Sequence, residues 1–193
     1  MLEFAALSTP RLDLRLPANR DIGQLVELAG DFRIFDTTEN IPHPYDAADA
    51  EAFILRAEAA WQSRRALHVV AIEKSERFLC GYAMLRFDAG LNSAELGYWI
   101  GAPYWHQGFA TEAADALVTY AFGTLALQRL SACYLTRNAE SGRVLEKLGF
   151  EQEGVQRQHS FKYGYGEDLV LTGLLRSEWL ARSLSTDRAG DVL

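Results

Sequence analysis

The chain has 193 residues and a formal net charge of −7, with 49% hydrophobic and 23% charged residues. This length and composition fit one globular domain with a substantial core and exclude a disordered chain. The net negative charge argues against a general nucleic-acid binder, because such proteins carry an excess of basic residues.

Neither a membrane segment, a secretion signal nor a metal site is expected. The first ten residues contain no basic region or long apolar run, and no segment reaches the roughly 20 apolar residues of a membrane span. Cys80 and Cys133 lie far apart in apolar surroundings, which favours free thiols and a cytoplasmic setting. No metal-ligand spacing with acids or cysteines is found for His43, His68, His106 or His159.

The first third of the chain predicts a strand and two helices. Apolar and polar residues alternate over residues 11–16, as in a half-buried strand. Asn19 can cap a helix over residues 19–31, and residues 46–65 have a second helical pattern. The prolines between them predict an irregular segment at 32–45, which is either one wall of a pocket or a plain connector.

An antiparallel meander is predicted next. The apolar runs 67–73, 78–87 and 93–100 are separated by short polar turns, so consecutive strands should pair as neighbours. A helix follows over residues 107–122. The passage from strand to helix, residues 95–111, contains glycine and small residues at the helix start.

This passage predicts an anion site. The first N–H groups of a helix have no intrahelical partner and point toward one place, where they favour a negative charge. Gly108 and Ala110 are small enough to let a phosphate approach these amides. Strand, turn and helix also occur in series as an ordinary connection, so the pattern alone is weak.

The last third predicts a strand at 130–136, a helix at 139–148 that begins at Asn138, and strands at 150–157 and 169–175. Gly149 is the expected left-handed cap of that helix. The glycines in the loop 158–168 suggest mobility. We expect a single α/β domain over residues 1–180, with one mixed, largely antiparallel sheet of about seven strands flanked by helices. A polar tail at 181–193 is expected to fray.

Several separated motifs resemble the ribosomal-protein N-terminal acetyltransferase (RimJ/RimL-like) branch of the GCN5-related N-acetyltransferase (GNAT) superfamily. The likeness covers the chain to about Trp179 and is more specific for the superfamily than for a substrate. It is carried by the strand and helix at 95–122, Asn-Ala-Glu-Ser at 138–141, Val-Leu-Glu-Lys-Leu-Gly-Phe-x-x-Glu-Gly at 144–154, Thr-Pro-Arg-Leu-x-Leu-Arg at 9–15 and Ile-Pro-x-Pro-Tyr at 41–45.

The resemblance implies a V-shaped sheet, splayed between the strand ending near Ile100 and the strand at 130–136, with acetyl-coenzyme A in the gap. Strand atoms of Tyr98, Trp99 and Ile100 would bond the pantetheine amides. The usual pyrophosphate motif is Arg/Gln-x-x-Gly-x-Gly/Ala, but Trp105 stands at its first position. The implied pyrophosphate ligands are the main-chain amides of His106, Gln107, Gly108, Phe109, Ala110 and Thr111.

The implied chemistry involves two side chains. Alkylamines are mostly protonated at neutral pH, so a carboxylate should remove a proton, and Glu95 is the first candidate. A strand glutamate is equally common as a solvated or salt-bridged residue. By resemblance Asn138 contacts the pantetheine and Ser141 stabilises or protonates the thiolate, although both also fit a helix start. Leu145 occupies the position of a tyrosine acid found in many superfamily members.

The sequence therefore predicts an acyltransferase that moves the acetyl group of acetyl-CoA directly to a primary amine in a ternary complex. The acceptor is either a protein N-terminus or a small-molecule amine. The alternative is a non-catalytic acyl-CoA-binding or regulatory module. A nucleotide-binding βαβ protein is disfavoured by the hairpin-rich first half. Homodimerisation is compatible with the sheet edge and with the habit of the family.

Overall fold

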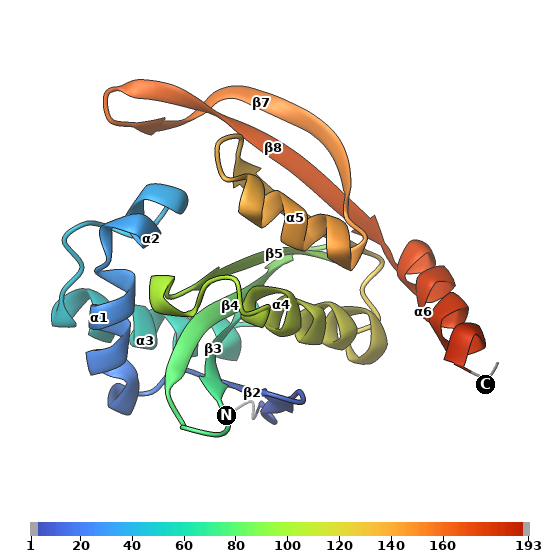
Figure 1. The fold of residues 1–193 in the computed structure, drawn as a ribbon, viewed down its shortest axis with the longest axis horizontal. Helices are drawn as coiled ribbons and strands as arrows, with labels where there is room; N and C mark the ends of the chain where they lie inside the picture. The colour runs from blue at the N-terminus through green and yellow to red at the C-terminus, as the bar shows by residue number, and fades with distance from the viewer. Residues whose placement is uncertain (1–3, 191–193) are drawn as a thin grey trace.

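The computed structural model describes residues 4–190, which form one eight-stranded sheet in the order β1-β2-β3-β4-β5-β6-β8-β7, flanked by helices (Figure 1). The strands are β1 Leu7–Ser8, β2 Leu12–Arg15, β3 Ala66–Glu73, β4 Leu79–Asp88, β5 Ser93–Ile100, β6 Arg129–Leu135, β7 Glu151–Lys162 and β8 Tyr165–Leu175. The α-helices are α1 Ile22–Ala29, α2 Phe32–Thr37, α3 Ala47–Gln62, α4 Phe109–Thr119, α5 Ala139–Leu148 and α6 Arg176–Gly190. Short helical turns occupy Asn19–Asp21, Ala102–Tyr104 and Tyr120–Thr124.

The sheet is mixed because one connection crosses over. Strands β2 to β5 pair antiparallel in sequence, and β3 to β5 form the predicted meander. Helix α4 then returns the chain so that β6 runs parallel to β5. The pairing between β5 and β6 ends early: only Ser93, Ala94 and Glu95 are joined to Arg129, Leu130 and Ser131. Beyond Glu95 the two strands part, which confirms the expected splay.

Side chains on the two faces of the sheet enter two cores. The larger core joins α4 and α5 to the sheet and includes Leu85, Leu96, Leu117 and Phe122. The smaller core joins α1 and α3 to the opposite face through Leu25, Ile54, Val70 and Ile72. Because side chains alternate along a strand, successive residues of β4 and of β5 point to opposite faces of the sheet.

Helix α5 begins and ends where the sequence predicts. The Asn138 side chain accepts the N–H of Ser141 at 3.3 Å, and Gly149 ends the helix with φ of 93°. Helix α4 is shorter than predicted, since its regular part ends at Thr119 and a π-helical turn continues to Thr124.

The segment predicted to be irregular at 32–45 contains a helix, α2. The Asp31 side chain caps it by accepting the Arg33 N–H at 2.8 Å, and Ile34 anchors it with 1% exposure. The prediction for residues 32–37 was therefore wrong, while residues 38–46 are irregular. Asn19 lies inside a short 3₁₀ turn, so it does not cap α1 as predicted.

The predicted mobile loop at 158–168 is instead part of a long hairpin. Strands β7 and β8 continue to a tight turn at Tyr163 and Gly164, whose φ values of 54° and 82° match a hairpin turn. Figure 1 shows this hairpin extending over α2. The C-terminal segment is helical from Arg176 to Gly190, and residues 191–193 of the predicted tail lie outside the described residues.

Within residues 4–190, no helix combines the length and apolar character needed to cross a membrane.

Candidate functional site

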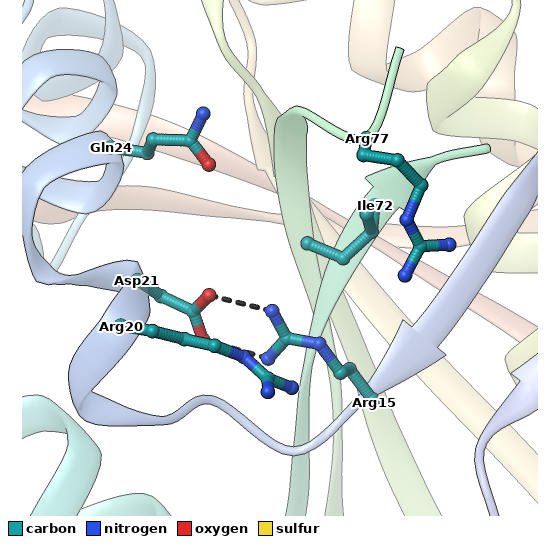
Figure 2. A pocket seen from close by; sticks show the side chains of 6 residues that line it. All are labelled: Arg15, Arg20, Asp21, Gln24, Ile72 and Arg77. Atoms are coloured by element: carbon teal, nitrogen blue, oxygen red, sulfur yellow. Dashed lines mark hydrogen bonds and ion pairs between the residues drawn. The ribbon is translucent and has the colours of Figure 1, made fainter. Parts of the chain in front are cut away.

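A large cavity opens where β5 and β6 part. Its volume is about 1100 Å³, and it runs from the start of α4, past the start of α5, to the segment at 38–45. The segment at 38–45 thus forms a wall, as one of the two sequence interpretations proposed. A smaller pocket of about 330 Å³ lies elsewhere, beside β2 (Figure 2). There Arg15 donates to both carboxylate oxygens of Asp21 at 2.7 and 2.6 Å, a pair that fastens β2 to the start of α1.

The turn before α4 presents main-chain N–H groups to the cavity. Gly108 precedes the helix with φ of 80°, and the first helical bond runs from the Glu112 N–H to the Gly108 carbonyl at 3.1 Å. The amides before Glu112 therefore have no partner inside the helix, and the helix dipole adds positive potential there. We call this turn the cradle; its cavity-lining residues are His106, Gly108, Phe109, Ala110 and Thr111.

Contacts from the turn between β1 and β2 hold the cradle in place. The Arg11 Nη1 donates to the Gln107 carbonyl at 2.8 Å, while its Nε donates to Glu112 at 2.6 Å. Thr9 also donates to Glu112, at 2.6 Å. Burial raises the pKa of Glu112, but these hydrogen bonds outweigh burial and lower the pKa overall. Gln107, which the sequence included among the cofactor-binding residues, does not line the cavity.

Trp105 performs a structural role at the position where the family motif has arginine or glutamine. Its indole Nε1 donates to the Ile100 carbonyl at 2.5 Å, which closes the turn that leads from β5 into the cradle. The Arg33 guanidinium lies 5.7 Å from the centre of the Trp105 ring. The same guanidinium pairs with Asp31, with Nη2 and Oδ2 2.6 Å apart.

Successive main-chain N–H and C=O groups of β5 point alternately toward β4 and toward the splay between β5 and β6. The Gly101 N–H donates to the Cys80 carbonyl at 2.9 Å, and Ile100 stands opposite Gly81. With this antiparallel register, the N–H and C=O of Trp99 point toward β4, whereas those of Tyr98 and Ile100 point toward the splay. The edge available to a ligand is therefore provided by Tyr98 and Ile100, and not by Trp99.

Ser141 lies beside a tyrosine from the other side of the splay. The Tyr98 hydroxyl donates to the Ser141 carbonyl at 3.0 Å, and it also lies 3.0 Å from the Ser141 Oγ. Burial raises the pKa of Tyr98, so the phenol stays neutral. A phenol has one proton, so while it donates to the carbonyl, the Ser141 hydroxyl keeps its own proton to donate to the phenol oxygen or to a ligand.

Asn138 is engaged by protein groups. Its Oδ1 caps α5 at the Ser141 N–H, and its Nδ2 donates to the Thr37 carbonyl at 3.3 Å. The residue therefore ties α2 to the start of α5 at the cavity wall. The capping role that the sequence suggested beside the ligand role is confirmed.

Glu95 faces the cavity at the point where the strands part. It lies opposite Arg86 in the β4–β5 pairing, and the Arg86 Nη2 bonds its Oε2. Its side chain is 28% exposed, and Oε1 has no hydrogen-bond partner among the described residues. Glu95 therefore forms a salt bridge, as one of the two sequence interpretations expected, and it also borders the cavity.

The residues present fit a pyrophosphate-bearing cofactor. A Cβ added at Gly108 would meet only the Arg11 Nη2, at 3.4 Å, so the absent side chain leaves open space at the cradle. Among the residues that the structure describes, no group of three or more His, Cys, Asp or Glu side chains is arranged to hold a metal ion.

A comparison with protein families decides the assignment. The model described as "Acetyltransferase (GNAT) domain" matches residues 11–151. The chain belongs to the GNAT acetyltransferase family. GNAT domains are acetyl-CoA-dependent acyltransferases, so the family accounts for the splay and the cradle together.

Relatives of this GNAT protein include ribosomal-protein acetyltransferases. It is 27% identical over 186 residues to the ribosomal protein uS5-alanine N-acetyltransferase of Escherichia coli, covering 90% of this chain and 92% of that protein. It is 44% identical over 83 residues to the uncharacterized N-acetyltransferase YoaA of Bacillus subtilis, covering 43% and 47% of the two chains. The chain spans about half the length of the first curated relatives it matches.

The fold agrees with this family. The solved structure of RimL, a ribosomal L7/L12 alpha-N-protein acetyltransferase in complex with coenzyme A, superimposes with a TM-score of 0.82. Its sequence identity is 16%, and the match covers 90% of this chain and 99% of that one, so the likeness concerns the fold. The resemblance to the RimJ/RimL-like branch is confirmed.

Sequence reasoning missed two features of this GNAT site. The Tyr98 hydroxyl meets Ser141 across 43 positions of the chain, a contact that no local motif announces. Arg137 also lines the cavity and joins Asp36 at 2.9 Å to Glu167 at 2.9 Å, linking α2 to the β7–β8 hairpin. Its position directly before Asn138 was the only available signal.

Proposed function

We propose that residues 1–180 form an acetyl-CoA-dependent N-acetyltransferase that moves the acetyl group directly to a primary amine within a ternary complex. The observation that carries this proposal is the convergence of three parts on one cavity: the cradle, the open edge of β5 and the Tyr98–Ser141 pair. Acetyl-CoA, when bound, supplies an activated thioester.

The cradle and the strand edge hold the cofactor. Main-chain amides from His106 to Thr111 bind the pyrophosphate, helped by the helix dipole. The main-chain groups of Tyr98 and Ile100 bind the pantetheine amides as an added strand would, while Asn138 borders the pantetheine channel. The Ile100 carbonyl is already used by Trp105, so its N–H and the groups of Tyr98 contribute most.

Glu95 removes the proton that the acceptor amine must lose. The neutral amine nitrogen then forms a bond to the thioester carbon, and the carbon–sulfur bond breaks. The nitrogen loses its second proton as the amide forms, and that proton ends on the departing thiolate to give the free thiol. The first proton passes to Glu95 directly or through one water and leaves to solvent. Because Arg86 occupies only Oε2, Oε1 is the atom that accepts it.

Ser141 stabilises the sulfur that departs. Its hydroxyl donates to the thiolate as negative charge develops. The neutral Tyr98 hydroxyl donates to the Ser141 carbonyl and lies 3.0 Å from the Ser141 Oγ, so it holds the serine in position beside the sulfur. A positioned pair of hydroxyls thereby replaces the tyrosine that Leu145 excludes from α5.

The acceptor is a primary amine, either a protein N-terminal α-amine or that of a small molecule. The names of the uS5-alanine acetyltransferase and of RimL support a protein α-amine, because both of those proteins are named for ribosomal-protein acceptors. A cytoplasmic location and the absence of general nucleic-acid binding belong to the same proposal, on the grounds of two free cysteines and a net charge of −7. A homodimer belongs to it on the grounds of the sheet edge and the habit of the family.

Isothermal titration with acetyl-CoA tests this function. We expect saturable binding with one site per chain, and no heat at high micromolar ligand would overturn the proposal. A non-catalytic acyl-CoA-binding module would bind equally well, but it would acetylate no member of a broad panel of amines. The Ser141→Ala variant separates binding from transfer, since it should keep the affinity and slow the reaction.

A further inference from the structure

The cavity has a second compartment that the cofactor does not explain. Aromatic side chains from α3 and from strands β3 to β5 border it, together with a tyrosine from the segment before α3. We call it the aromatic compartment, and its rings are Tyr45, Phe53, His68, Tyr82 and Trp99.

The compartment lies on the α1/α3 face of the sheet. Leu96 and Ile100 of β5 are buried in the larger core with α4, whereas Trp99 packs against the smaller core with α1 and α3. Tyr82 and Trp99 stand opposite each other in the pairing of β4 with β5, so both rings emerge on this face. The compartment is therefore separate from the cradle, which belongs to α4.

The rings form one continuous wall. Phe53 meets Tyr82 edge-on, with centroids 5.5 Å apart, and Tyr82 stacks on His68 at 5.9 Å. Tyr82 also stacks on Trp99 at 6.2 Å. All of these side chains are half-buried, so each keeps part of its surface open to the cavity.

This wall offers apolar surface and little charge. The His68 Nδ1 and the Tyr82 hydroxyl are 2.6 Å apart and satisfy each other. Burial lowers the pKa of His68 to about 4, so the imidazole is neutral at physiological pH. The charged side chains that line the cavity nearby are Asp49 and Arg56 on α3 and the Arg86–Glu95 pair on the strands.

The wall lies within reach of the reacting amine. Opposite pairs follow one another along β4 and β5 on this face: Arg86 with Glu95, then Met84 with Gly97, then Tyr82 with Trp99. The splay opens after Glu95, beside Gly97, and two residues of strand place Trp99 about 7 Å further along. That distance is about the length of a large side chain.

We propose that the aromatic compartment binds a bulky apolar or aromatic side chain next to the acceptor amine, so that this enzyme prefers α-amines of large apolar residues. The inference rests on the proposed acetyl transfer, because it concerns the acceptor of that reaction. Apolar surface leaves water when such a side chain enters, and the rings supply favourable edge and face contacts.

Amino-acid amides test this preference on the unmodified protein. Binding of L-phenylalaninamide, L-leucinamide, L-alaninamide, glycinamide and L-lysinamide to the protein saturated with coenzyme A is measured by calorimetry, and kcat/KM is measured with acetyl-CoA. We expect phenylalaninamide to exceed alaninamide by at least about tenfold in both, as a pocket filled by several carbons allows. Equal values, or a preference for alaninamide, overturn the compartment's role.

A pair of variants on α3 locates the effect. Phe53→Ala removes one ring of the wall, and we expect the phenylalaninamide-to-alaninamide ratio to fall about tenfold. Leu55→Ala is the matched control, since Leu55 is 67% exposed on the same helix and does not line the cavity. An unchanged ratio in Phe53→Ala overturns the proposal.

The two proposals fail separately. If phenylalaninamide binds selectively but no amine is acetylated, the transferase function fails and the compartment stands. If every amide is acetylated at the same rate, the transferase stands and the compartment's role fails. Thermal unfolding of Phe53→Ala shows whether the variant folds, and the amide panel on the unmodified protein tests the preference even when it does not.

Discussion

Replacing Gly108 by alanine separates backbone strain from cofactor binding. Gly108 has φ of 80°, where a residue with a Cβ costs about 1–2 kcal/mol. The added methyl would meet only the Arg11 Nη2, at 3.4 Å, so strain is the main cost to the fold. In a chain of this size, that cost lowers Tm by about 2–8 °C.

Gly90→Ala is the matched control for this strain. Gly90 has φ of 88°, no atom lies within 4 Å of its added Cβ, and it does not line the cavity. Both variants should therefore lose similar stability in a thermal melt. Only Gly108→Ala places a methyl in the cradle, where losing one hydrogen bond to a charged phosphate costs about 1.5–3 kcal/mol.

Calorimetric titration with coenzyme A gives the decisive comparison. The cost of one such bond corresponds to about 10- to 100-fold weaker binding for Gly108→Ala, with Gly90→Ala close to the unmodified protein. If the two variants bind coenzyme A equally well, the amides of the cradle do not hold the pyrophosphate, and the reasoning from the turn geometry is refuted.

Further predictions concern the chemistry and the fold. Ser141→Ala should lower kcat about 100-fold or more, and Tyr98→Phe by a smaller factor, with the acetyl-CoA KM unchanged; a rise in KM alone would contradict the roles given to Ser141 and Tyr98. Burial lowers the pKa of His68 to about 4, so between pH 6.5 and 4 the unfolded chain binds more protons than the folded chain. The contribution of His68 to the free energy of unfolding is therefore complete above pH 6.5 and falls by about 3 kcal/mol as the pH drops to 4. Urea unfolding of His68→Phe should show a flatter pH slope. Arg137→Met should lower the free energy of unfolding by about 3 kcal/mol, because the Glu167 side chain is only 6% exposed and would lose its ion-pair partner. Adding Glu167→Gln to that variant should restore part of the lost stability.

Local chemistry explains what the sequence predicted well. Asn138 and Gly149 set the ends of α5 through contacts within a few residues, and Gly108 sets the start of α4 through its own backbone. The alternation of β3, β4 and β5 likewise depends on which side chains each strand buries. Features of this kind depend on residues that are close together in the sequence, so the sequence alone predicts them.

Long-range contacts explain what the sequence missed. Helix α2 has six residues, too few to be stable alone, and depends on the burial of Ile34. The β7–β8 hairpin extends over exposed polar positions, so it lacks the alternation that predicts a strand. The side of the sheet that Glu95 takes, and the meeting of Tyr98 with Ser141, follow from the assembled strands and from no local pattern.

Release of the coenzyme A thiol in the presence of an amine tests the central claim most directly. The protein is mixed with acetyl-CoA and with a panel of amines that includes peptide N-termini, and free thiol is followed over time. We expect release that depends on the amine and an equal amount of acetylated amine by mass spectrometry. Tight binding of acetyl-CoA with no amine-dependent release would contradict the claim and leave a binding module.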